Sequence, residues 1–232
     1  MKKITNGLLV ILEGGEGVGK TTQAKALVDY YRSQGYSAKY FREPGGDELA
    51  EQIRNMVLYN EMDVNTEILL MSAARNINVQ NNILPALTNG NIVILDRFTI
   101  STMVYQGLLK NGDMDFIAKC TKQVTQDLYD NDSYSIEFTL LCDPNVAIER
   151  AASEGHERNK HDILPIEDYK KINDGYFLLS CNDKYKRFKN NNCFYKILDT
   201  STVTKENVLD QLKFYIDALI TISDIYEEHN NE

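Results

Sequence analysis

Apolar residues near the N-terminus fall into two short runs separated by a helical stripe. Leu8 to Leu12 is a continuous apolar run, which is typical of a strand buried on both faces of a parallel sheet. After Lys20 the apolar positions recur at helical spacing until Gly35, and Tyr36 to Phe41 then predicts a second strand. The beginning of the chain is therefore expected to form a β-α-β unit.

The same alternation continues to the end of the sequence. Further strands are predicted at Asn91 to Asp96, Ile136 to Cys142 and Phe194 to Asp199, each separated from the next by long helical stretches. Parallel strands need crossover helices on the faces of the sheet, so we expect an α/β fold: a three-layer α/β/α sandwich with a five-stranded parallel sheet. A last helix should pack on this sheet through Val208, Leu212, Tyr215, Ile216 and Leu219.

Composition and length favour one globular domain that spans residues 1–232. Hydrophobic residues make up 43% of the chain and charged residues 25%, close to the average of globular domains, and no Pro/Gly/Ser-rich linker divides it. Residues 153–165 are charged and poor in apolar side chains, so they are interpreted as a mobile flap. Residues 227–232 are interpreted as a polar C-terminal tail.

The charge balance restricts the partners. With 25 Lys and Arg against 34 Asp and Glu, the net charge of −9 repels nucleic acid and anionic lipid, and no apolar run approaches the roughly 18 residues of a membrane span. The four cysteines lie far apart without a C-x-x-C pair, so a reduced, cytoplasmic setting is expected. The three histidines lack the spacing of metal ligands.

A phosphate-binding loop follows the first predicted strand. Gly14 to Thr21 fits G-x-x-x-x-G-K-[ST], and it lies between a buried strand and a helix, as its mechanism requires. Backbone N–H groups would surround the phosphates of ATP, Lys20 would act on the transferred group, and the Thr21 hydroxyl would coordinate Mg²⁺. The expected ATP-binding residues are Gly14, Gly15, Glu16, Gly17, Val18, Gly19, Lys20, Thr21 and Thr22.

A carboxylate and an arginine end the third predicted strand. Asp96 would lie at the carboxyl edge of the sheet beside the phosphate loop, where it could hold Mg²⁺ through water. Arg97 is expected to clamp a second anion, because its planar fork suits phosphate. The alternative for Asp96 is a cap on the following helix.

The run from Asp96 to Gly107 resembles the D-R-[YFH]-x-x-S-[ST]-x-A-Y-Q-G signature of thymidylate kinases, with Val104 in place of the alanine. The segments 42–46, 49–54, 73–75 and 84–87 are similar to the bacterial form of that family, in the same order. The similarity spans Leu8 to Gly107 and continues more loosely to Leu219. It implies a P-loop kinase fold, phosphoryl transfer from ATP to dTMP, a requirement for Mg²⁺ and a homodimer.

The resemblance also assigns roles to single residues. Arg97 corresponds to the residue that holds the acceptor phosphate, Glu16 to the one that binds the sugar 3′-hydroxyl, and Tyr105 to the wall that excludes a 2′-hydroxyl. The remaining substrate-binding positions are Arg42, Pro44, Arg54, Met71, Arg75, Ser101 and Gln106. From the residues alone, a solvated Arg54, an ordinary helix salt bridge at Arg75, and core or cap roles for Ser101 and Tyr105 stay open.

Departures from the family pattern leave two roles unsettled. Gly17 and Val18 stand where many members have a loop arginine, so the resemblance implies a catalytic cation from the flap. Arg158 is favoured for its fork geometry, although ungapped counting points to Lys160, and a flap without a catalytic residue is the third possibility.

The other departures concern the base and a later strand. Met71 replaces the usual aromatic residue on the thymine face, and Leu141 replaces a usual aspartate. Strict thymine selectivity is thus less firmly implied than phosphoryl transfer. The alternatives are a kinase of dUMP or a 5-substituted dUMP, a P-loop ATPase switch, and an inactive nucleotide binder, which intact Lys20 and Arg97 disfavour.

Overall fold

The computed structural model describes residues 1–130, 133–153, 164–182 and 192–230. Five strands form one sheet in the order β2-β3-β1-β4-β5, and every neighbouring pair is parallel. Their bounds are β1 (Leu8–Gly14), β2 (Ala38–Arg42), β3 (Ile92–Asp96), β4 (Tyr134–Leu141) and β5 (Cys193–Asp199). The five strands that the sequence predicts are confirmed, with ends that differ by at most two residues.

The helices connect these strands and cover both faces of the sheet. Their bounds are α1 (Lys20–Ser33), α2 (Glu48–Tyr59), α3 (Val64–Asn78), α4 (Leu84–Thr88), α5 (Thr99–Thr102), α6 (Met114–Tyr129), α7 (Pro144–Ser153), α8 (Ile166–Cys181) and α10 (Lys205–Asn230). Two π-helical segments, η1 (Val79–Ile83) and η2 (Met103–Leu109), continue α3 and α5. The sequence analysis did not predict either π-helix.

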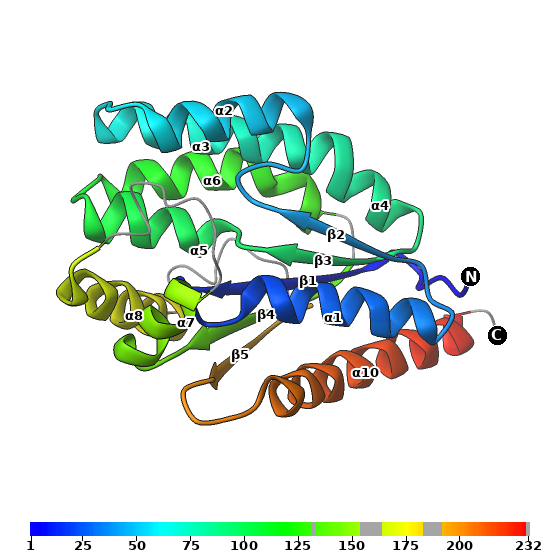
Figure 1. Ribbon diagram of the computed structural model, residues 1–232. Helices are drawn as coiled ribbons and strands as arrows, with labels where there is room; N and C mark the ends of the chain where they lie inside the picture. The colour runs from blue at the N-terminus through cyan, green and yellow to red at the C-terminus, as the bar shows by residue number, and fades with distance from the viewer. Residues whose placement is uncertain (131–132, 154–163, 183–191, 231–232) are drawn as a thin grey trace.

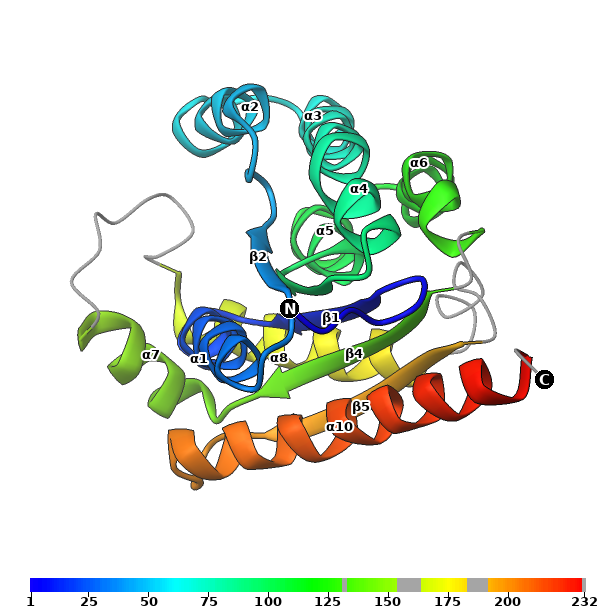
Figure 2. The ribbon, with the colours of Figure 1, turned by 90° about the vertical axis from the view of Figure 1, so that its right-hand side faces the viewer.

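The alternation of β1 shows how the three layers are held together. Leu8, Val10 and Leu12 belong to a core that includes the inner faces of α1 and α10, whereas Leu9 and Ile11 belong to a core on the opposite face, beside η1 and α4. Figures 1 and 2 show the sheet between these two helical layers. The predicted α/β/α sandwich is therefore confirmed, as is the packing of the last helix on the sheet.

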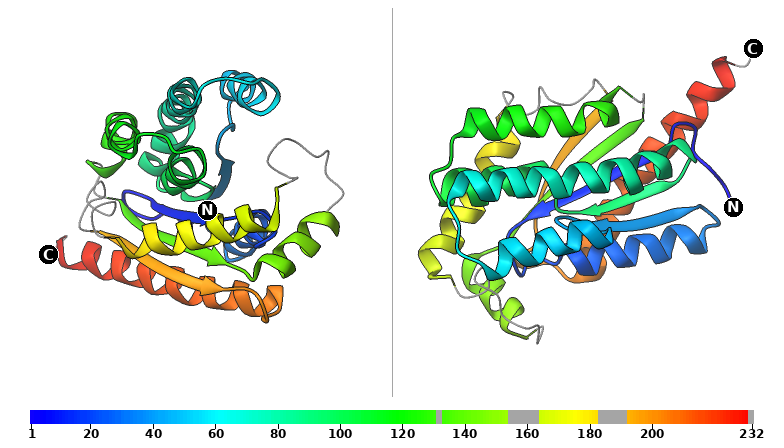
Figure 3. Two further views of the ribbon diagram at one scale, coloured as in Figure 1. Left: turned by 90° about the vertical axis from the view of Figure 1, so that its left-hand side faces the viewer. Right: turned by 90° about the horizontal axis from the view of Figure 1, so that it is seen from above.

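Helix α2 forms an outer layer that packs on α3 and contacts the sheet at the end of β2 through the Glu51–Arg42 ion pair. Its residues Ala50 and Ile53 pack on Ala74 of α3. Figure 3 shows α3 and α6 side by side over the sheet, with α2 at their edge. The carboxyl ends of β2 and β3 open toward these helices, so side chains from several elements meet there.

Parts of the predicted organisation fall beyond the described ranges. The flap at about 153–165 lies mostly among residues 154–163, which the structure does not describe, so it stays a prediction, as does the single domain. Helix α10 continues to Asn230, and most of the expected tail is therefore helical. No helix in the described part of the chain has the length and apolarity needed to cross a membrane.

Candidate active site

The phosphate-binding loop links β1 to α1 as the sequence predicts. Gly17 has a φ of 73°, and a Cβ at this position would lie 2.0 Å from the carbonyl oxygen of Ala147. Only glycine fits there, because the loop runs directly against α7. The Lys20 ammonium folds back and donates to the Gly15 carbonyl. Burial, followed by the nearby charge of Arg97, lowers the pKa of Lys20 to about 8, so this buried cation would gain from an anionic ligand.

Thr21 and Asp96 present two oxygens at the end of the loop. The Thr21 hydroxyl donates to Asp96 Oδ2 over 2.5 Å, and the Tyr40 hydroxyl donates to the same oxygen over 3.3 Å. These are hard oxygen ligands of the kind that Mg²⁺ prefers. Among the described residues no cluster of three or more His, Cys, Asp or Glu could hold a metal. A Mg²⁺ ion here would need phosphate oxygens and water as its other ligands, which fits a nucleotide site.

Arg97 connects the loop with the neighbouring cavity. Its Nη1 donates to the Gly14 carbonyl and to the Tyr176 hydroxyl, both over 2.9 Å, and its Nη2 forms an ion pair with Glu16. The guanidinium also lies over the Tyr105 ring, 5.3 Å from its centre. Burial alone would lower the pKa of Arg97, but Glu16 and the two tyrosines raise it overall. Arg97 therefore presents a permanent positive charge in a fixed place.

Arg97 also has an unusual backbone. Its φ is 69°, in the left-handed region that few non-glycine residues adopt. Such conformations cost about 1–3 kcal/mol and persist where the surrounding structure imposes them, often at functional sites. With this backbone the Arg97 side chain reaches both the Gly14 carbonyl in the phosphate loop and the Ser101 hydroxyl in α5.

Glu13 is a buried carboxylate beneath Arg97 that sequence reasoning missed. It is fully buried and accepts hydrogen bonds from the amides of Phe98 and Ser101 and, over 2.6 Å, from the Ser101 hydroxyl. Burial and the nearby Glu137 raise the pKa of Glu13 to about 7. Glu13 thus fixes the start of α5, and with it the direction of Arg97 and Ser101.

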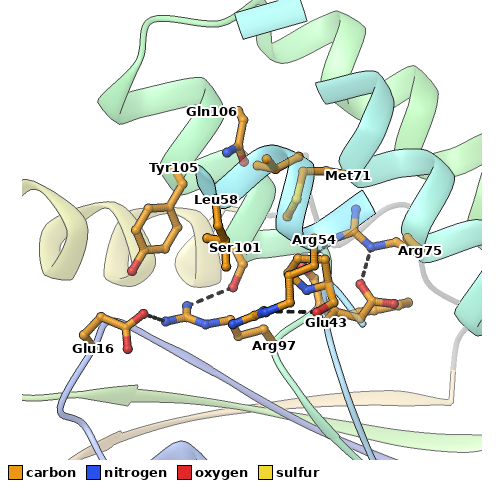
Figure 4. A pocket seen from close by; sticks show the side chains of 13 residues that line it. Glu16, Glu43, Arg54, Leu58, Met71, Arg75, Arg97, Ser101, Tyr105 and Gln106 are labelled. Carbon is orange, nitrogen blue, oxygen red and sulfur yellow. Dashed lines mark hydrogen bonds and ion pairs between the residues drawn. The ribbon is translucent and has the colours of Figure 1, made fainter. Parts of the chain in front are cut away.

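A cavity of about 610 Å³, counted with its open mouth, lies between the phosphate loop and helices α2, α3 and η2. In Figure 4 Glu16 and Arg97 lie at one end of the cavity, while Met71, Arg75 and Gln106 lie at the other. The predicted substrate-binding residues in its wall are Glu16, Pro44, Arg54, Met71, Arg75, Arg97, Ser101, Tyr105 and Gln106.

Arg75 does not form the helix salt bridge considered for it, because its partner Glu43 lies in the loop after β2. Its side chain is 1% exposed and forms a buried ion pair with Glu43, with Nε and Oε2 2.6 Å apart. Its Nη2 donates to the Phe98 carbonyl and to the Thr102 hydroxyl. Its Nη1 is buried without a hydrogen-bond partner among the described residues, and Arg75 lines the cavity. The ion pair with Glu43 therefore holds the Arg75 side chain in place and leaves its Nη1 donor available at the cavity.

Two other predicted arginines lie differently. Arg54 lines the cavity and donates to the Pro44 carbonyl over 3.0 Å. The Arg42 side chain is 47% exposed, pairs with Glu51 and does not line the cavity. The two flap candidates, Arg158 and Lys160, lie outside the described residues.

A second hollow, of about 760 Å³, adjoins the phosphate loop. It is lined by residues that include Gly19 and Thr22 of the loop and α1, Arg150 of α7 and Thr200 after β5. Arg150 Nη2 donates to the Thr200 carbonyl over 2.9 Å, which joins α7 to the segment before α10. Sequence reasoning did not identify Arg150 or Thr200, because neither belongs to a recognisable motif.

A phosphate loop and a cation-rich cavity at the carboxyl edge of this parallel sheet define the class of P-loop nucleotide kinases. Residues 12–207 match the family model described as thymidylate kinase. This chain therefore belongs to the thymidylate kinase family.

Several relatives support this assignment. A thymidylate kinase of Albidiferax ferrireducens is 35% identical over 81% of this chain and 89% of its own length. One of Rickettsia africae is 37% identical over 74% and 82%, respectively. The crystal structure of thymidylate kinase from Ehrlichia chaffeensis superposes with a TM-score of 0.64 at 26% identity and covers 92% of this chain. These comparisons give no support to a P-loop ATPase switch or to a shifted substrate.

Proposed function

We propose that this protein transfers the γ-phosphoryl group of ATP to dTMP, giving dTDP and ADP. Family membership supports this activity. In this chain the activity is supported mainly by the position of Arg97, which contacts Gly14 of the phosphate loop and lines the adjacent cavity. A donor phosphate on the loop and an acceptor phosphate on Arg97 would lie side by side.

The chemistry of the acceptor agrees with the side chains present. A phosphate monoester has a second pKa of about 6, so at pH 7 it is mostly a dianion and needs no general base. The reaction instead requires two polyanions to be aligned and their charge to be neutralised. Although the chain carries a net charge of −9, Lys20, Arg54 and Arg97 gather positive charge at this edge of the sheet.

The acceptor would bind with its phosphate on Arg97 and its base near Met71. Glu16, now paired with Arg97, would accept a hydrogen bond from the sugar 3′-hydroxyl, and the Tyr105 ring would close the space of a 2′-hydroxyl. The thymine edge would meet Arg75 and Gln106. Ser101 and Arg54 complete the wall.

On the donor side, Lys20 would hold the β and γ phosphates. Thr21 and Asp96 would hold Mg²⁺, which supplies charge neutralisation between the phosphates when it is bound. The flap would add a further cation, Arg158 with Lys160 as the alternative. The adenine of ATP would lie in the hollow beside Arg150.

Two further proposals concern the protein in the cell. The chain forms a homodimer in which a second copy covers the outer groove between α3 and α6. That groove includes Ala73, Val124 and Leu69, whose side chain is 53% exposed. The protein works in the cytoplasm, where its four free cysteines stay reduced.

The function is tested by measuring ADP release with ATP and Mg²⁺ across all natural nucleoside and deoxynucleoside monophosphates. The expected result is the highest kcat/KM for dTMP. No release of ADP above background with dTMP, from protein that is folded by circular dichroism, would refute the proposal.

A further inference from the structure

A buried carboxylate behind the cavity contacts one of its wall residues. Glu67 of α3 has a side chain that is 2% exposed, and its Oε2 accepts a hydrogen bond from Gln106 Nε2 over 3.2 Å. The Lys110 ammonium lies 2.5 Å and 2.6 Å from the two Glu67 oxygens. Glu67 does not line the cavity, whereas Gln106 does.

The carboxylate determines which way the Gln106 amide points. An ionised carboxylate can only accept hydrogen bonds, so the amide must turn its NH₂ group toward Glu67. Its carbonyl oxygen then faces away from Glu67. Gln106 Oε1 is indeed buried without a hydrogen-bond partner among the described residues. The ammonium of the partly exposed Lys110 neutralises the charge of the buried Glu67 carboxylate and holds it in place.

Gln106 is held in register by the π-helix. Gln106 lies in η2, and Lys110 follows it four residues later, so both reach the same carboxylate on α3. Figure 4 shows the Gln106 side chain extending toward Met71, at the end of the cavity opposite Glu16. The cavity wall therefore presents an unpaired acceptor at Gln106 and an unpaired donor at Arg75 Nη1.

We infer that Glu67 is a specificity-determining positioning residue, which keeps the carbonyl of Gln106 toward the base and so selects thymine or uracil over cytosine. Thymine and uracil carry an N3–H donor beside a C4 carbonyl acceptor. Cytosine carries an acceptor at N3 and an amino donor at C4, the opposite at both positions. This inference rests on the proposed function, because it assumes that the base of the acceptor nucleotide occupies this end of the cavity.

Binding measurements without ATP test the inference separately from catalysis. The dissociation constants of dTMP and 5-methyl-dCMP are compared by calorimetry, since these two ligands differ only at the positions that Gln106 and Arg75 would read. In Glu67→Gln the neighbouring amide can accept as well as donate, so Gln106 is free to flip. The preference for dTMP should fall by about tenfold, the size of one hydrogen bond lost or mismatched.

A double-mutant cycle separates positioning from general damage. In a Gln106→Ala background, Glu67→Gln should leave the remaining preference unchanged, because the residue that it orients is gone. Glu61→Gln, an exposed carboxylate in the loop before α3, is the matched control and should leave the preference as in the wild type. Glu67→Asp, which withdraws the carboxylate from Gln106, should lower the preference in the same direction.

The outcomes are distinct. An unchanged preference in folded Glu67→Gln and Glu67→Asp, or an equal fall with and without Gln106, would overturn the inference. If the wild type binds dTMP but does not phosphorylate it, the proposed function fails. The binding preference for dTMP over 5-methyl-dCMP can then still be compared between the wild type and the Glu67 variants. If the wild type binds neither nucleotide, both fail.

Discussion

The carboxylate of Glu43 and the guanidinium of Arg75 form an ion pair across 2.6 Å with side chains that are only 2% and 1% exposed. The Arg42–Glu51 pair, one loop away, is similar in length at 2.9 Å, but its side chains are 47% and 34% exposed. The two pairs differ in their surroundings more than in their geometry. Burial raises the pKa of Glu43 even against the opposing effect of Arg75, which shows how strongly the interior penalises an unpaired charge there.

Removing one partner from each pair should therefore have unequal effects. We expect Glu43→Ala to lower the free energy of unfolding by about 3–5 kcal/mol, because it leaves the Arg75 charge buried and uncompensated. Glu51→Ala should cost less than about 1 kcal/mol, as exposed pairs do. Urea denaturation of both variants provides the comparison. Equal losses in the free energy of unfolding would show that burial does not increase the contribution of the Glu43–Arg75 pair to stability.

Lys20→Ala should abolish most of the phosphoryl transfer. Lys20 is the buried cation of the phosphate loop, and the loss of one preorganised charge-stabilising group lowers kcat by about 100-fold or more. Lys25→Ala, an exposed lysine on the same helix, is the matched control and should retain wild-type turnover. Steady-state ADP release checks both variants. Wild-type turnover by Lys20→Ala would exclude the proposed role of this lysine.

Arg97→Ala should raise KM for dTMP and lower kcat together. A clamp on the acceptor phosphate both binds the substrate and aligns it for attack, so the two parameters change in the same variant. KM for ATP should change less. Initial rates measured with dTMP and ATP varied in turn give the two KM values separately. A change confined to KM for ATP would show that Arg97 binds the donor nucleotide and not the acceptor.

Glu13→Gln should stabilise the ligand-free protein, and only at higher pH. The folded pKa of Glu13 is about 7 against an ordinary value of 4.5, so the native state binds the extra proton between these values and the wild type loses stability as pH rises through them. Below pH 4.5 the group is neutral in both states, and the variant should match the wild type. Above pH 7 it should gain up to about 3 kcal/mol. Thermal unfolding at pH 4.5 and pH 8 tests this, and an equal gain at both would contradict it.

The sequence was sufficient to predict where candidate site residues lie in the fold wherever those residues form local patterns. The phosphate loop and Asp96–Arg97 each combine a buried strand with adjacent polar residues, so position along the chain fixes position in the fold. Glu13, Glu43 and Glu67 were missed, because their partners lie 88, 32 and 39 residues away. In a linear sequence a buried carboxylate is indistinguishable from a solvated one.

The orientation of the arginines could not be predicted for a related reason. Arg42 and Arg75 are both arginines in family motifs, yet one is exposed beside Glu51 and the other is buried beside Glu43. The difference depends on how α2 and α3 pack over the end of β2, a tertiary arrangement with no local sequence signal. The π-helix η2, which places Gln106 against Glu67, depends on tertiary packing in the same way.

Met71 lines the end of the cavity where the base would bind, and it is only 9% exposed. An aromatic side chain under a base contributes about 1–3 kcal/mol, whereas a thioether against a ring contributes about 0.3–1.5 kcal/mol. Met71→Phe should therefore tighten dTMP binding by about 1 kcal/mol, which is roughly fivefold in KM.

The same substitution should narrow the range of bases accepted. A flexible methionine adapts to different substituents at the pyrimidine 5-position better than a rigid ring does, so the wild type should use dUMP at an appreciable fraction of the dTMP rate. The ratio of kcat/KM for dTMP and dUMP should rise in Met71→Phe and stay unchanged in Met56→Phe, whose methionine is 45% exposed on α2. A strong and equal preference for dTMP in all three proteins would show that residue 71 does not control the choice at the 5-position, and selectivity there would then depend on other side chains of the cavity wall.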